Sequence, residues 1–342
     1  MQKIQKYYNT DKVSQSSLKD LAYHPGYYKA KYIDKTISEE YGDDADHFII
    51  GSAAECLLLT PEFWEQMYSI RSFELSPQLR KLADYLIKNK TNYSNITSLF
   101  ELGKSLNLFG QIKNFSTFET LLEKENFLEN LNFYKNSVNK TVITEEQYKK
   151  AVQIVNSFST SIFTKQYFIK TEHVEILTSL PIYWFYKKVP CKSLIDFVRI
   201  NHLTKSISIN DLKTTRFETK NFKSSILQYR YDIQGAFYLD AFKWWVENIR
   251  TDLKDYEIIG FSFFVESTKN IGSPLIFHLT LNDVHIGKYG GEICNNNGLK
   301  INIEGFDKLI DDLLWHQETQ IWSYTKDQYE NKGIIEVNIG QC

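Results

Sequence analysis

Two aspartates and a lysine stand in neighbouring predicted strands, at positions where their side chains could act together. Asp211 and Lys213 occupy alternate positions in a predicted strand, residues 206–213, so both side chains lie on one face. Asp196 comes late in the preceding predicted strand, residues 192–198, and a hairpin would bring it beside Asp211. Two converging carboxylates offer the oxygen ligands that suit Mg²⁺. A nearby lysine could orient an attacking water or hold a phosphate.

The acidic-x-basic triplet is weak evidence when it stands alone. Composition predicts about five such triplets in a chain of this kind, and a solvated strand end with an ion pair explains a single one. The surroundings favour the site, because the preceding strand carries its own aspartate and a helix follows. On that helix Tyr231, Gln234 and Tyr238 share one side. Packing in the core is the alternative interpretation of the two tyrosines.

A further carboxylate and a group of cations are candidates for the same site. Glu55 ends the segment Gly51-Ser-Ala-Ala-Glu55, on a predicted helix of small residues that could approach a sheet closely. A glutamate on such a face needs a partner, so it is a third metal ligand, an ion-paired residue or an exposed one. The cations could bind a phosphate backbone, or could simply be solvated charges at the start of a helix. They are Lys213, Arg216, Lys220, Lys223 and Arg230.

The predicted elements describe one α/β domain with a mixed sheet. The first half of the chain is mainly helical, with a helix over 46–59 and a helical insertion at about 76–139. A short helix is predicted to end at Pro25-Gly26, and a capping box at Thr144–Gln147 opens another helix. The predicted strands are 182–186, 192–198, 206–213, 257–266 and 275–281. The predicted later helices are 224–249 and 305–323.

Composition and missing motifs exclude several classes of protein. The 342 residues carry a formal net charge of −2, so no global basic field indicates nucleic acid. The four cysteines form no CxxC pair, and no HExxH, GxSxG or GxxxxGK[ST] motif occurs. The isolated histidines are expected to be turn or surface residues. The polar N-terminus and the short apolar stretch at 48–59 favour a cytoplasmic protein with no membrane segment.

An ordered set of motifs resembles the RecE-like branch of the PD-(D/E)XK nuclease superfamily, the phage-type exodeoxyribonucleases. The opening motifs are Ser14-Gln-Ser-Ser-Leu18, His24-Pro25 and Gly51-Ser-Ala-Ala-Glu-Cys-Leu-Leu-Leu59. The later motifs are Cys191-Lys192 with Asp196, Asp211-Leu-Lys213-Thr-Thr215, Tyr231-Asp-Ile-Gln-Gly-Ala-Phe-Tyr238 and Trp322-Ser-Tyr324. The resemblance spans most of the chain, except the insertion and the last few residues. It implies a single nuclease domain over 1–342, with a central mixed sheet flanked by helices.

The resemblance assigns roles to the candidate site. It implies that Asp196 and Asp211 bind divalent metal ions, that the Leu212 carbonyl is a further ligand, and that Lys213 is the catalytic lysine. The RecE-like pattern has histidine where this chain has Glu55. Other branches of the superfamily carry glutamate there, and a carboxylate is a harder ligand than imidazole. Glu55 therefore joins the candidate ligands, and the metal preference cannot be taken from the histidine-bearing relatives.

The resemblance also implies an activity and partners. Gln234 and Tyr238 match the helix motif of RecB-like nucleases, which supports the site and contacts DNA. The expected activity is a Mg²⁺-dependent DNA exonuclease that acts from duplex ends in phage-type recombination, with two ions and with Mn²⁺ as a substitute. A homo-oligomer and a single-strand annealing partner are implied as well. The alternatives are a structure-specific or restriction-like endonuclease and a non-catalytic DNA-binding or interaction protein.

Overall fold

The structure is a computed structural model that describes residues 2–37, 45–294 and 300–334. The chain divides into two compact units. One comprises Met1–Pro61 and Lys150–Cys342, and the other comprises Glu62–Lys149. The segment predicted as a helical insertion, 76–139, falls inside the second unit.

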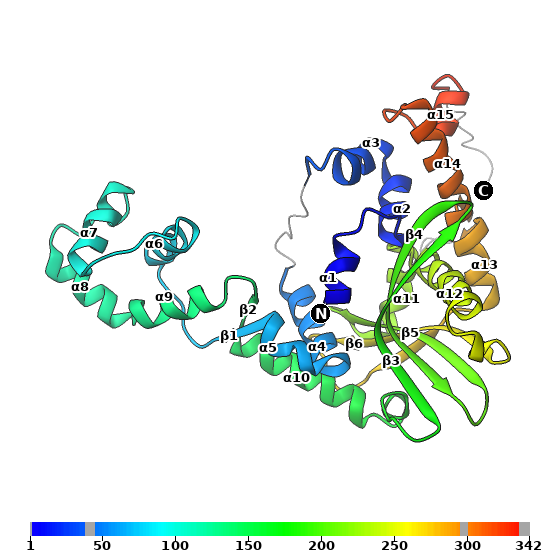
Figure 1. Cartoon of the computed structure of the whole chain (residues 1–342), viewed down its shortest axis with the longest axis horizontal. Coiled ribbons are helices and arrows are strands. Elements are labelled where there is room, and N and C mark those ends of the chain that lie inside the picture. The colour runs from blue at the N-terminus through cyan, green and yellow to red at the C-terminus, as the bar shows by residue number, and fades with distance from the viewer. Residues whose placement is uncertain (1, 38–44, 295–299, 335–342) are drawn as a thin grey trace. The chain divides into compact units, whose positions relative to one another are not determined.

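A five-stranded sheet forms the centre of the first unit (Figure 1). Neighbouring strands follow the order β3–β4–β5–β6–β7, and every neighbouring pair is antiparallel except the parallel pair β5–β6. A parallel pair needs a crossover, which the helices between β5 and β6 supply. The sheet is therefore mixed, as the sequence predicts. The strands are β3 (Val174–Tyr186), β4 (Val189–Asn201), β5 (Ser206–Thr215), β6 (Glu257–Ser267) and β7 (Leu275–His278).

Several predicted strand bounds are wrong: β4 extends three residues beyond each end of the predicted 192–198, and β3 and β7 differ for reasons that the structure shows. β3 begins eight residues before the predicted residue 182, because Ser179 and Pro181 interrupt the sequence pattern. Ser179 has φ 46°, and Pro181 is tolerated because β3 is an edge strand that needs no donor on one side. The predicted strand 275–281 stops at His278, since Thr280 caps the helix that follows.

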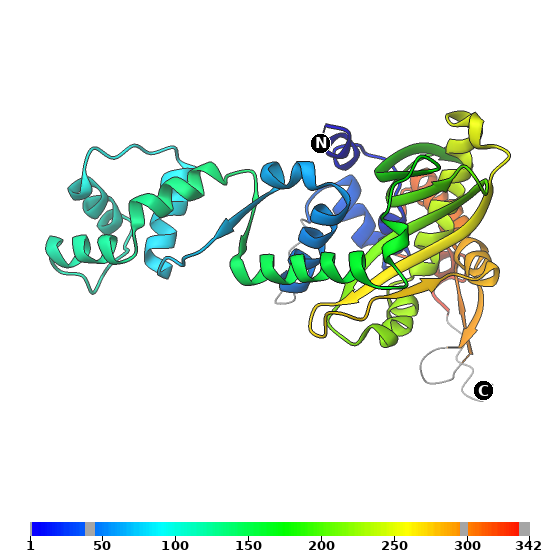
Figure 2. The same cartoon turned by 90° about the horizontal axis from the view of Figure 1, so that it is seen from below.

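A long helix, α12 (Tyr231–Asn248), packs on one face of the sheet (Figure 2). Its buried side chains join those of the strands in one apolar core, in which the ring of Phe237 lies 4.8 Å from that of Trp184. The sequence predicts a single helix over 224–249, and this is wrong. The chain breaks at Arg230, whose φ of 51° separates α12 from α11 (Phe222–Gln228). An ion pair of 2.9 Å with Asp232 holds Arg230 in that conformation.

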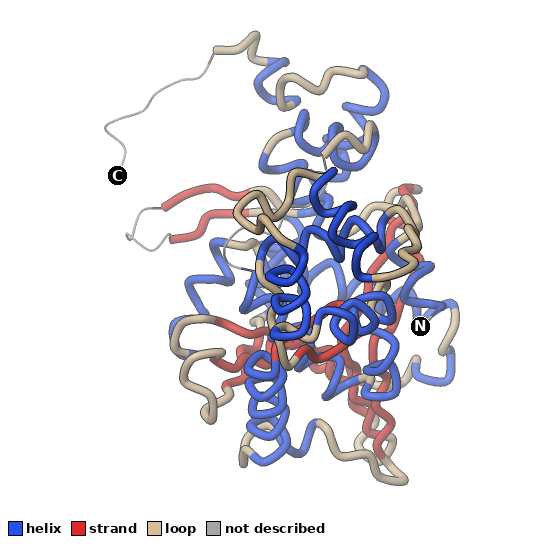
Figure 3. Tube along the Cα trace, turned by 90° about the vertical axis from the view of Figure 1, so that its left-hand side faces the viewer, coloured by secondary structure: helices blue, strands red, loops and turns tan. Residues whose placement is uncertain are grey.

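Further helices cover the opposite face and the edges of the sheet. α4 contacts β5, and the Ser157 hydroxyl of α10 donates a hydrogen bond to the buried Glu266 of β6. Helix α2 ends before Pro25, as predicted, and Pro25 is also the first residue of α3, whose N-cap is His24. β8 (Gly291–Cys294) and β9 (Lys300–Ile303) pair as a separate two-stranded ribbon (Figure 3). The helices of this unit also include α1 (Gln2–Tyr8), α2 (Gln15–Tyr23), α3 (Pro25–Tyr28), α4 (Ala45–Leu59), α10 (Glu145–Thr160), α13 (Leu281–Tyr289), α14 (Phe306–Thr319) and α15 (Lys326–Glu330).

The second unit has a core of its own. Phe118 and Phe127 are fully buried there among leucines of four helices. The parallel strands β1 (Tyr68–Arg71) and β2 (Thr141–Thr144) pair with each other. The predicted capping box is confirmed, since the Gln147 backbone N–H donates to the Thr144 hydroxyl at 3.1 Å. The helices are α5 (Trp64–Met67), α6 (Pro77–Lys88), α7 (Ile96–Ser105), α8 (Phe115–Lys124) and α9 (Phe127–Asn136).

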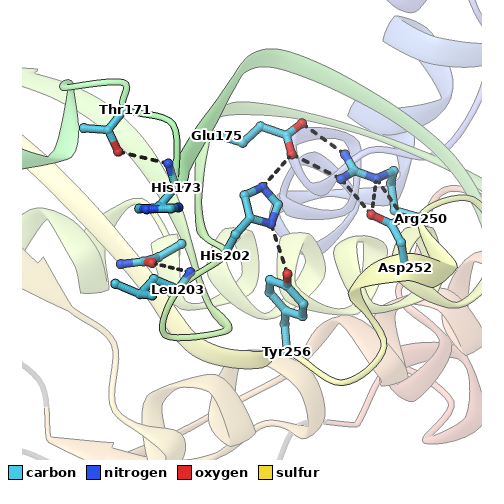
Figure 4. A network of polar contacts seen from close by, with 9 residues as sticks. Thr171, His173, Glu175, His202, Leu203, Arg250, Asp252 and Tyr256 are labelled. Atoms are coloured by element: carbon cyan, nitrogen blue, oxygen red, sulfur yellow. Dashed lines mark hydrogen bonds and ion pairs between the residues drawn. The ribbon is translucent and has the colours of Figure 1, made fainter.

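A polar network fixes the start of β3 and the turn after β4 (Figure 4). Glu175 accepts two hydrogen bonds of 3.1 Å from the Arg250 guanidinium, and His202 Nδ1 lies 3.0 Å from the Tyr256 hydroxyl. Hydrogen bonds to Asp252 and Glu175 raise the pKa of Arg250. His202 is thus a turn residue in a structural network, as expected for an isolated histidine. Among the described residues, no helix is long and apolar enough to cross a membrane.

Candidate active site

The hairpin of β4 and β5 places the two predicted aspartates side by side. Phe197 pairs with Asn210 in the ladder, so the next residues on each strand, Asp196 and Asp211, lie opposite each other. The backbone N–H of Leu212 donates a hydrogen bond of 2.8 Å to Asp196 Oδ2. Strand pairing alone therefore brings these two carboxylates and the Leu212 backbone together.

Asp211 is a buried carboxylate with a polar partner on each oxygen. Gln234 Nε2 of α12 donates a hydrogen bond of 2.5 Å to Oδ1, and the Lys213 ammonium forms an ion pair with Oδ2. Only 1% of Asp211 is exposed. Burial opposes the charge on Lys213, but the attraction of Asp211 outweighs it and raises the pKa of the ammonium. Lys213 therefore remains protonated at neutral pH.

Close packing of α4 on β5 brings Glu55 to the same place. Gly51 lies against Thr214 so closely that a Cβ at residue 51 would collide with the Thr214 hydroxyl. Glu55 follows one turn later on the same face of the helix. It lines a cavity of about 220 Å³ together with Leu212 and Lys213. The small residues of this helix thus allow the close approach that their size predicts.

The carboxylates of this cluster repel one another. Burial, followed by the charge of Asp211, raises the pKa of Glu55 to about 7, while Lys213 acts in the opposite direction. Burial and the charges of Asp211 and Glu55 likewise raise the pKa of Asp196 well above its ordinary value. One lysine does not balance three carboxylates, so the site favours an additional cation.

Replacing Glu55 by Gln is expected to stabilise the metal-free protein at pH 8. The pKa of Glu55 rises from 4.5 to about 7 on folding, so its charge costs free energy above pH 7. The cost disappears at pH values below 4.5, where the carboxyl is protonated in both states. We expect the variant to gain about 2 kcal/mol at pH 8 and much less at pH 5. Urea unfolding in EDTA measures both values.

The matched control for this variant is Glu318→Gln, on the exposed surface of α14. It should leave the free energy of unfolding unchanged at both pH values. If Glu55→Gln were no more stable than the wild type at pH 8, the crowding of charge around Asp211 would be disproved.

The residues present fit Mg²⁺ by their chemistry. The donors are carboxylate oxygens and the Leu212 carbonyl, which are the hard ligands that this ion prefers. Among the described residues, the buried Asp211 Oδ2 has no hydrogen-bond donor assigned to it, and it faces the Lys213 ammonium as its ion-pair partner. Within the described residues, no group of three His, Cys, Asp or Glu side chains is already arranged around a metal position. The donor types are therefore suitable, although a complete set of three side-chain ligands is not preformed.

Gln234 and Tyr238 are interior residues of α12. Gln234 orients Asp211, and the Tyr238 ring lies 6.1 Å from that of Phe261 in an edge-on contact. Only 3% and 6% of the two residues are exposed. These positions favour support of the site over a surface contact with DNA.

The predicted cationic residues do not act as one surface. Arg216 and Lys223 are exposed, and Arg216 lines a groove beside the site. Lys220 is exposed but forms an ion pair of 2.8 Å with Glu218. Arg230 is half-buried between Asp232 and the Glu304 carbonyl, so its charge is already balanced. Arg216 and Arg230 both line the groove, and Arg216 is the more exposed of the two.

Lys19 of α2 was missed by the sequence analysis. Its ammonium donates to the Tyr229 carbonyl at 3.1 Å and lies 5.3 Å from the centre of the Tyr231 ring. Burial and the nearby charge of Lys213 lower the pKa of Lys19 to about 8. The only sequence signal was its position directly after the Ser14–Leu18 motif, and nothing in that spacing connects it with β5.

Comparison with known proteins gives only weak structural likeness. No family model and no curated protein matches the chain. The chain is similar to a crystal structure named "Putative exonuclease" from Eubacterium rectale, with 12% sequence identity and a TM-score of 0.48. The match covers 98% of this chain and 95% of that one.

Proposed function

We propose that this protein is a metal-dependent deoxyribonuclease of the PD-(D/E)XK type that hydrolyses phosphodiester bonds from duplex DNA ends. The observation that carries the proposal is the position of Asp196 opposite Asp211, one residue beyond the ladder pair of Phe197 and Asn210, with Lys213 ion-paired to Asp211. Two adjacent carboxylates with an ammonium group ion-paired to one of them suit phosphodiester hydrolysis better than any other chemistry that these residues offer. The order of the motifs along the chain supports the RecE-like branch.

Asp196, Asp211, Glu55 and the Leu212 carbonyl would hold the metal. Two Mg²⁺ ions, or Mn²⁺ in their place, would polarise the scissile phosphate and lower the pKa of a bound water. The raised pKa of Glu55, about 7, describes the site without metal, where burial and the charge of Asp211 disfavour a further negative charge.

The other polar side chains of the site position these groups. Gln234 fixes the orientation of the Asp211 carboxylate through Oδ1. Lys213 keeps its proton at Nζ and presents a positive charge to the phosphate as negative charge develops. Phage-type recombination, a homo-oligomer and a single-strand annealing partner belong to the same proposal and are supported by the resemblance alone.

Digestion of end-labelled linear duplex DNA in Mg²⁺ tests the activity, with a covalently closed circle of the same sequence as the control. We expect mononucleotides from the linear DNA and an intact circle. Cleavage of the circle would instead show the restriction-like or structure-specific endonuclease. Failure to cut either substrate in Mg²⁺ or Mn²⁺ would contradict the proposal and favour a non-catalytic protein.

A further inference from the structure

A groove of about 680 Å³ opens beside the candidate active site. Phe48, Thr214 and Tyr231 line both this groove and the 220 Å³ cavity that contains Glu55 and Lys213. Tyr231 marks the junction, since the Lys213 ammonium lies 5.2 Å from the centre of its ring. A ligand that fills the groove would therefore extend to the site.

Aromatic side chains line this groove and remain open to water. The exposed fractions are 80% for Tyr23, 54% for Phe48, 55% for Phe217 and 52% for Tyr229. Single exposed aromatic residues are ordinary, but four around one groove form an apolar surface of the kind that marks a binding site. Their π-faces can stack on planar groups.

The charge of the groove is positive. Three cations, Lys19, Arg216 and Arg230, line it against one carboxylate, Asp20, which is itself bound to Lys31 at 2.9 Å and to the Tyr32 hydroxyl at 2.7 Å. The ligand therefore combines planar apolar groups with negative charge. Unpaired nucleotides have this chemistry, because their bases stack on aromatic rings while their phosphates contact lysine and arginine.

We infer that this groove binds unpaired nucleotides of a DNA strand and leads that strand to the active site. The choice of DNA rests on the proposed function. Bases in a duplex stack on one another and leave no face open to the rings, whereas an unpaired strand offers every base. The enzyme should therefore prefer an end that carries a single-stranded extension over a blunt end.

Fluorescence anisotropy in EDTA measures this binding without any cleavage. We expect labelled d(T)12 to bind more tightly than a 12-base-pair duplex. Tyr23→Ala, Phe217→Ala and Tyr229→Ala should each raise the Kd for d(T)12 by roughly 5-fold or more. Phe217→Trp should restore binding, because it keeps a stacking surface. Phe163→Ala and Tyr329→Ala remove equally exposed rings outside the groove and should leave the Kd unchanged.

The outcomes separate this inference from the proposed function. Tight binding of d(T)12 that depends on the groove aromatics would support the inference even if no cleavage occurs in Mg²⁺. The inference would be overturned by equal binding of duplex, by tighter binding of r(U)12, or by groove variants that bind like the wild type. In each of these cases, cleavage of linear duplex DNA in Mg²⁺ would still support the proposed function.

Discussion

Replacing Asp211 by Asn is expected to reduce DNA cleavage by about 10³-fold or more, because a buried carboxylate that would bind metal becomes a neutral amide. Asn has nearly the same shape as Asp, so its side-chain oxygen can still accept the hydrogen bond from Gln234. The packing of β5 should therefore be kept. The cleavage rate on labelled linear duplex measures the loss. Calorimetric titration with Mg²⁺ provides a second readout, in which the heat of binding should disappear with the charge.

Asp255→Asn is the matched control, because it removes a carboxylate from an exposed position of the same unit. It should cleave DNA and bind Mg²⁺ as the wild type does. The circular dichroism spectrum and thermal midpoint of Asp211→Asn should show that the fold is kept. A folded variant with the wild-type cleavage rate would remove Asp211 from the site and the nuclease assignment with it.

Replacing Lys213 by Met is expected to lower kcat by roughly 10²- to 10³-fold, since the positive charge that faces the phosphate is lost. The same change should strengthen Mg²⁺ binding, because the ammonium now competes with a cation for Asp211 Oδ2. Single-turnover cleavage and Mg²⁺ calorimetry measure the two effects. Opposite signs in these measurements would distinguish a catalytic lysine from one that only supports the fold.

Lys254→Met, on the exposed surface after α12, is the control for Lys213 and should change neither quantity. Weaker Mg²⁺ binding by Lys213→Met, together with a wild-type kcat, would contradict the assignment. In that case the ion pair with Asp211 would serve folding rather than chemistry.

The sheet could be predicted largely from the alternation and apolar runs of its strands. β4, β5 and β6 follow simple patterns with clear turns, so their positions agree with the sequence to within a few residues. The first part of β3 does not, because Ser179 and Pro181 interrupt the pattern and only pairing with β4 keeps this segment in the sheet. The helix break at Arg230 could not be predicted from the sequence either. It depends on a left-handed backbone conformation that contacts with Asp232 and the Glu304 carbonyl hold in place.

The residues of the candidate site also differ in how far the sequence predicts them. Asp196, Asp211 and Lys213 could be placed together because a hairpin and a period of two determine their neighbours. Gln234 followed from helical spacing on the crossover helix. Lys19 could not be found, because α2 reaches the site through tertiary packing alone, almost 200 residues away in sequence from Lys213.

The contact between Gly51 and Thr214 makes a residue without a side chain decide how closely α4 lies to β5. The Thr214 hydroxyl occupies the space that a Cβ of residue 51 would need, so the separation of α4 from β5, and with it the position of Glu55, depends on the missing side chain. A methyl group at position 51 would meet Thr214 Oγ1 and push α4 away from β5, which would carry Glu55 away from Asp211. With the metal ligands that we propose, this movement would shift the balance between a small octahedral ion and a larger, more tolerant one.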